Sequence, residues 1–118
     1  MVFLLGIALQ LSDDPSSAEK VYTRALSLAT AQQAHVILSN LGNLYRQQKR
    51  LQLAKEIFTK SLDLCPGYAP SHNNFGLVFV ALGQWEEARS CFEKALHSDP
   101  FLDAAKSNLM KAETVYDG

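Results

Sequence analysis

The feature that most constrains this chain is a set of residues that recurs every 34 positions. Leu41-Gly42 recurs as Phe75-Gly76, and the two glycines are 76 − 42 = 34 residues apart. Further pairs at the same offset are Ala54 with Ala88, Phe58 with Phe92, Leu62 with Leu96 and Pro66 with Pro100. A fixed period of this length predicts stacked structural units, because each unit is too short to bury its apolar face alone.

Each recurring residue type has a physical role in a pair of packed helices. Gly42 and Ala54 are small, so two helices can approach closely where these residues meet. Phe58 is large enough to fill the space between neighbouring helix pairs. Pro66 ends a helix, because proline lacks an amide donor and restricts the residue before it. The unit is therefore predicted to be a hairpin of two antiparallel helices.

The order Leu/Phe-Gly, aromatic, Ala, Phe, Pro resembles the pattern of the tetratricopeptide-repeat family over residues 35–102. The tryptophan that is usual near the start of each repeat is replaced by Leu38 and His72, and we expect His72 to have a structural role. The resemblance implies an all-α solenoid of helical hairpins, wound as a right-handed superhelix and closed by a C-terminal capping helix. The first helix of each hairpin would line its concave face.

The whole chain of 118 residues is predicted to be a single domain of such repeats. We expect a partial repeat at 1–32 that begins inside a hairpin, complete repeats at 35–68 and 69–102, and a capping helix at 103–116. The partial repeat is offset by 42 − 6 = 36 residues, so two extra residues are expected near 30–34. This pattern is typical of a fragment or isoform of a longer array. The predicted helices are 1–11, 15–29, 34–48, 51–64, 69–82, 85–98 and 101–116.

The concave groove should bind a peptide or a helix. Asn40, Asn74 and Asn108 recur on it 34 residues apart. An asparagine amide both donates and accepts hydrogen bonds, so this ladder is expected to hold the backbone of an extended peptide. It is similar to the asparagine ladder of the peptide O-linked N-acetylglucosaminyltransferase; the alternative is that asparagine is simply frequent at this repeat position. The residues predicted to line the groove are Asn40, Asn43, Arg46, Gln47, Asn73, Asn74, Leu77, Asn108 and Lys111.

A second binding mode of the family, a clamp for the terminal carboxylates of heat-shock chaperones, is not favoured. Asn43 and Asn74 fit the asparagines of that clamp. The lysines and arginines that it also needs are not supplied by the residues at the matching positions, which are Phe3, Ser39, Pro70, Ala104 and Asn108. The groove beside Leu77 is instead apolar, which favours an apolar or helical ligand.

Composition argues against several other classes of protein. The formal net charge of −1 predicts neither a nucleic-acid surface nor contact of this chain with a membrane. The two cysteines, Cys65 and Cys91, are too few for a disulfide scaffold and are expected to be buried thiols. No spacing of histidine, cysteine or carboxylate residues indicates a catalytic or metal site. The chain itself is therefore not expected to be an enzyme or to need a cofactor.

An alternative function follows from a second resemblance. Residues 71–80, 91–96 and 103–109 are similar to the C-terminal arrays of the transmembrane-and-tetratricopeptide proteins, which are endoplasmic-reticulum O-mannosyltransferases acting on cadherins. The chain would then be the substrate-selecting tail of a membrane enzyme whose catalytic part lies elsewhere. A free-standing interaction module is expected in the cytoplasm, and such a tail in the endoplasmic reticulum. The residues leave the ligand, the compartment and the oligomeric state open.

Overall fold

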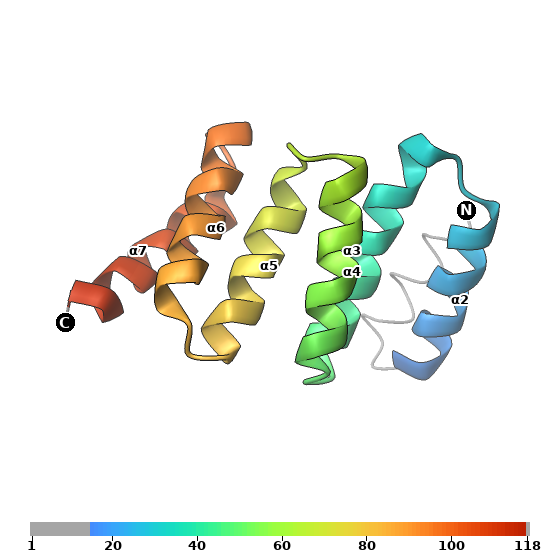
Figure 1. The fold of residues 1–118 in the computed structure, drawn as a ribbon, viewed down its shortest axis with the longest axis horizontal. Coiled ribbons are helices and arrows are strands. Elements are labelled where there is room, and N and C mark those ends of the chain that lie inside the picture. The colour runs from blue at the N-terminus through green and yellow to red at the C-terminus, as the bar shows by residue number, and fades with distance from the viewer. Residues whose placement is uncertain (1–14, 118) are drawn as a thin grey trace.

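The computed structural model describes residues 15–117, which form a stack of α-helices (Figure 1). Consecutive helices are antiparallel neighbours, and the molecule measures 44 × 27 × 22 Å along its principal axes. The expected helix at 1–11 lies outside the described residues. The described helices are α2 (Pro15–Leu28), α3 (Ala31–Gln47), α4 (Leu51–Leu64), α5 (Ala69–Ala81), α6 (Trp85–Ser98) and α7 (Asp103–Asp117). The all-α solenoid of helical hairpins is thereby confirmed, with α3–α4 and α5–α6 as two hairpins.

The start of α3 differs most from the predicted boundaries. This helix begins at Ala31, three residues earlier than predicted, and has 17 residues whereas its counterpart α5 has 13. The backbone N–H of Thr30 donates to Oε1 of Gln33 at 3.3 Å, which satisfies a donor at this end of the helix. Helix α3 is thus four residues longer than α5 (17 − 13 = 4), and the added residues lie in the segment where the repeat spacing predicts an insertion. At the other end of the stack, α7 begins at Asp103, two residues later than predicted.

The recurring glycines lie directly beneath the recurring phenylalanines. Phe58 and Phe92 are fully buried. A Cβ atom added to Gly42 would lie 2.9 Å from Cε1 of Phe58, and one added to Gly76 would overlap Cε1 of Phe92 more severely. The helix backbone therefore touches the aromatic ring in both hairpins. The close approach predicted from the repeat is confirmed.

Gly76→Ala should lower the free energy of unfolding by about 1–3 kcal/mol, because the new methyl group overpacks the site against the buried ring of Phe92. The severe overlap with Cε1 of Phe92 places the overpacking cost in the upper part of this range, above the gain of about 1 kcal/mol that alanine brings as the better helix former. Gly67→Ala is the matched control, since its Cβ would meet only Ser98 Oγ at 3.7 Å. Urea unfolding of the two variants tests this, and a Gly76→Ala midpoint equal to that of the wild type would contradict it.

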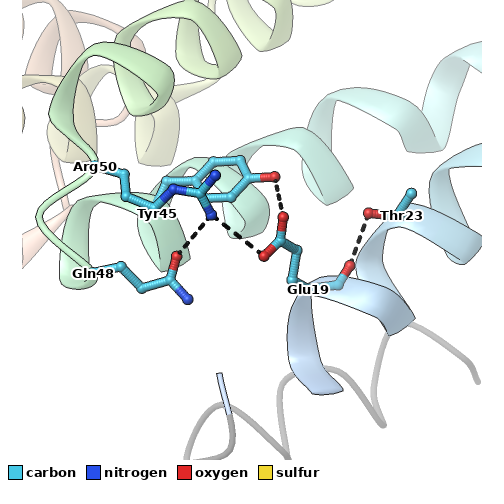
Figure 2. A network of polar contacts seen from close by, with 5 residues as sticks. All are labelled: Glu19, Thr23, Tyr45, Gln48 and Arg50. Carbon is cyan, nitrogen blue, oxygen red and sulfur yellow. Dashed lines mark hydrogen bonds and ion pairs between the residues drawn. The ribbon is translucent and has the colours of Figure 1, made fainter. Parts of the chain in front are cut away.

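A polar network ties α2 to the turn of the α3–α4 hairpin (Figure 2). The hydroxyl of Tyr45 donates to Oε1 of Glu19 at 2.9 Å, and Nη1 of Arg50 lies 3.5 Å from Oε2 of Glu19. The Arg50 guanidinium also lies over the Tyr45 ring, 4.7 Å from its centroid. Burial, reinforced by the hydrogen bond to Glu19, raises the pKa of Tyr45 to about 12.

Two buried hydroxyl groups join the two hairpins. Ser61 on α4 donates to the backbone carbonyl of His35 on α3 at 2.8 Å, and its Oγ lies 2.7 Å from Oγ of Ser71 on α5. Beside them, the ring of Phe75 stacks on those of Phe58 and Phe79, with centroids 6.0 and 4.8 Å apart. These contacts set the position of α5 relative to the first hairpin, and thus the spacing of the inner helices.

The last helix covers the apolar surface of the α5–α6 hairpin. Ala105 packs into a cluster with Ala69 and Ala95, and Ala112 packs against Phe92 and Ala88. The residues of α7 that face away are mostly polar, as a capping helix requires. The position equivalent to Gly76 is Met110 (110 − 76 = 34), which is 69% exposed.

Candidate peptide-binding groove

The helices α3, α5 and α7 form the inner row of the stack. Helix α5 contacts both α3 and α7, so equivalent positions on the three helices are neighbours. The contact between α5 and α7 includes a hydrogen bond, because Nδ2 of Asn108 donates to Oδ1 of Asn73, the residue before its repeat equivalent Asn74, at 2.9 Å. The structure therefore brings asparagines of α5 and α7 into direct contact.

The asparagines of α5 and α7 form a directional relay. Asn108 donates to Asn73, and Nδ2 of Asn73 donates in turn to Oδ1 of Asn74 at 3.4 Å. Asn73 is buried and acts as the connector, a role that the repeat pattern does not predict. The relay leaves the amide nitrogen of Asn74 as a donor and the amide oxygen of Asn108 as an acceptor.

Asn40 on α3 stands apart from this relay. Its Nδ2 donates to the backbone carbonyl of Val36 in its own helix at 3.1 Å, which leaves its Oδ1 as an acceptor. Equal spacing along the sequence predicts three equivalent asparagines. The structure instead gives Asn40, Asn74 and Asn108 different partners, and each keeps one side-chain amide atom without a hydrogen bond to any of residues 15–117.

Arg46 and Asn43 form a pair at the C-terminal end of α3. Nε and Nη2 of Arg46 both donate to Oδ1 of Asn43, at 3.1 and 2.8 Å. Burial lowers the pKa of Arg46, although a guanidinium remains charged at neutral pH. No carboxylate pairs with Arg46 in the part of the chain that the structure describes. The sequence analysis predicts that Asn43 and Arg46 line the groove, but it does not predict the hydrogen bonds between them.

The remaining predicted groove residues differ in exposure. Gln47 and Lys111 are exposed. Leu77 and Val80 are half-buried, because they pack against the cluster formed by Ala88, Phe92 and Ala112. Leu77 therefore belongs partly to the core, and only part of its side chain is exposed. The apolar character predicted for this segment extends along α5.

His72, at the position of the usual tryptophan, joins the end of one hairpin to the start of the next. Its Nε2 lies 2.7 Å from the backbone carbonyl of Pro66. Among residues 15–117 there is no group of three or more histidine, cysteine or acidic side chains that could hold a metal ion. None of the helices in this range is both long enough and apolar enough to cross a membrane.

The two cysteines differ in burial, and the prediction that both are buried is wrong for Cys65. Cys91 is buried as expected, but Cys65 is only partly buried, because it lies at the end of α4 where the chain leaves the helix. Burial is the main reason why the pKa of the Cys91 thiol is raised to about 11.

The raised pKa of Cys91 predicts a loss of stability in alkali. An acid whose pKa is higher in the folded state holds its proton longer there, so the unfolded state loses protons first as the pH rises. The contribution of Cys91 is therefore constant below about pH 8.5, and stability falls from there towards pH 11. Urea unfolding midpoints measured between pH 7.5 and 10 test this expectation, because this window begins below the pKa of an ordinary thiol, about 8.5, and ends below that of Cys91, about 11. Cys91→Ala should weaken the pH dependence and Cys65→Ala should not; equal slopes in both variants would contradict the assignment.

The stacked hairpins define a helical-repeat scaffold. The sequence profile of the tetratricopeptide-repeat family matches residues 33–98, and the chain belongs to this family. It is 28% identical over 104 residues to heat shock protein STI1 of Saccharomyces cerevisiae, a match that covers 88% of this chain and 18% of STI1. The chain thus spans less than a fifth of the length of that relative.

Solved structures show the same architecture. The first tetratricopeptide domain of Spaghetti (RPAP3), bound to the HSP90 peptide SRMEEVD, superposes with a TM-score of 0.87 at 20% identity, covering 99% of this chain and 91% of that one. An O-GlcNAc transferase from Thermobaculum terrenum gives a TM-score of 0.85 at 30% identity, covering 94% of this chain and 21% of that one. These relatives do not favour the alternative of an O-mannosyltransferase tail.

Proposed function

We propose that this chain is a protein–protein interaction module that holds a peptide in the groove formed by α3, α5 and α7. The observation that carries the proposal is that three asparagine side chains on these helices each have one amide atom that is not hydrogen-bonded to residues 15–117. Asn40 and Asn108 offer acceptors, and Asn74 offers a donor. An extended peptide backbone presents both carbonyl oxygens and N–H groups, so it can pair with all three.

The relatives support a peptide as the ligand. The Spaghetti domain has the same fold and was solved with a bound peptide. The similarity to the O-GlcNAc transferase supports the comparison of Asn40, Asn74 and Asn108 with the asparagine ladder of that family. The cations of a terminal-carboxylate clamp are missing, since Ser39, a position where the clamp needs a cation, is a buried serine. The peptide is therefore proposed to bind through its backbone and internal side chains.

The triple variant Asn40→Ala, Asn74→Ala, Asn108→Ala tests the proposal. Each hydrogen bond contributes about 0.5–1.5 kcal/mol, so the loss of three should weaken binding at least about tenfold. The probe is a library of random nonapeptides with acetylated and amidated ends, selected on the wild-type chain, and the measurement is the Kd of the best peptide.

A control variant removes polar side chains from the outer helices. Gln52→Ala and Thr59→Ala on α4, with Ser90→Ala on α6, change three exposed polar residues outside the groove. This variant should bind as the wild type does. Unchanged affinity in a folded asparagine variant, shown by its circular dichroism melt, would rule out the proposed backbone contacts.

A further inference from the structure

The inner helices α3 and α5 are nearly devoid of charge. Between them they contain a single lysine, arginine, aspartate or glutamate, which is Arg46. All 12 acidic residues of the chain lie outside these two helices. The charge presented by this part of the groove is therefore positive and is concentrated at one residue near the end of α3.

The bond between Arg46 and Asn43 makes this place a cluster of hydrogen-bond donors. Oδ1 of Asn43 is the acceptor of the pair, and it is already engaged by Nε and Nη2 of Arg46. What remains is the amide nitrogen of Asn43 and the outer N–H groups of the guanidinium, all of them donors. A ligand group that meets this cluster must accept hydrogen bonds, and a carboxylate accepts the most.

The charge of Arg46 is also poorly compensated. Its side chain is half-buried, and no carboxylate in residues 15–117 pairs with it. A cation that is partly removed from water gains more from an incoming anion than one on an open surface. By contrast, Arg50 already pairs with Glu19 and Arg89 with Glu93. Arg46 thus differs from these arginines in lacking an acidic partner.

We infer that Arg46, oriented by Asn43, selects peptides that contain an internal glutamate or aspartate side chain. This inference rests on the proposed function and adds a ligand class to it. The apolar segment along α5, with Leu77 and Val80 half-buried and Ala81 exposed, takes an aliphatic residue near that acidic position. A terminal carboxylate is not required.

A double-mutant cycle measures the contact directly. The nonapeptide library with acetylated and amidated ends is selected on the wild-type chain, and the best peptide is made again with its acidic residue replaced by the matching amide. A charge-assisted hydrogen bond predicts that this change weakens binding to the wild type about tenfold or more. With Arg46→Gln the two peptides should bind equally. Arg24→Gln, an exposed arginine on α2, should keep the full discrimination.

The outcomes of these experiments separate the inference about Arg46 from the proposed function. Selected peptides without an enriched acidic position would overturn this inference and leave the proposed function intact, whereas failure of the wild-type chain to bind any library peptide would overturn both. Equal discrimination by Arg46→Gln and the wild type would also overturn it. Stronger selection of free C-termini or phosphoserine in parallel libraries would show that the anion is not an internal carboxylate. The comparison of the two peptides on the wild-type chain does not depend on the stability of any variant.

Discussion

Replacing Phe92 with alanine should lower the free energy of unfolding by about 3–5 kcal/mol, a large part of the total stability of a domain of this size. Phe92 is fully buried, and its ring touches the backbone of Gly76. It also packs against Ala88 in its own helix and Ala112 on α7. Removing the ring leaves a cavity where α5, α6 and α7 meet, and rigid helices cannot fully close it.

Two further phenylalanine substitutions serve as comparisons for Phe92→Ala. Phe58→Ala removes the equivalent ring of the first hairpin, which is also fully buried, and should cost a similar amount. Phe101→Ala removes a ring that is 84% exposed and should cost less than about 1 kcal/mol. Urea unfolding monitored by circular dichroism measures all three. Equal losses for Phe92→Ala and Phe101→Ala would show that the recurring phenylalanine does not anchor the stack.

Ending the chain after Pro100 should lower stability by more than about 3 kcal/mol, because the α5–α6 hairpin loses the helix that covers it. The truncation removes Ala105 and Ala112 from the two apolar clusters of that hairpin, together with the half-buried Leu109. In a stack, each hairpin is stabilised only by its neighbours, so we expect α5 and α6 to unfold first. Hydrogen exchange should then be faster in residues 69–98 than in residues 31–64.

The control for this truncation is a change on the outer face of α7. Met110→Lys alters a residue that is 69% exposed and keeps the covering helix in place. Its urea midpoint should stay close to that of the full chain. Equal midpoints for the truncated and full-length chains would contradict the capping role of α7.

The fold follows from the sequence because its determinants recur. Gly76 and Phe92 meet within one hairpin, and Gly42 and Phe58 repeat the same contact. Helices α4 and α6 accordingly match their predicted ranges. The start of α3 was harder to predict, because it depends on a hydrogen bond from Thr30 to a glutamine that a non-repeated segment supplies.

The groove could be predicted only in part. The period places Asn40, Asn74 and Asn108 on adjacent helices, but it carries no information about side-chain partners. The bond from Asn108 to Asn73 joins two helices and depends on rotamers that only the packed structure sets. The Arg46–Asn43 pair is three residues apart on one helix face, so the spacing alone could have suggested it.

The most direct test of the account is the site at which the chain binds a selected nonapeptide, mapped by NMR. The side-chain amide signals of Asn40, Asn74 and Asn108 should shift as the peptide is added, together with backbone amides along α3, α5 and α7. The amide signals of Gln52 on α4 and Gln84 before α6 should stay in place. Shifts concentrated on α4 and α6, with the three asparagines unaffected, would contradict binding in the groove.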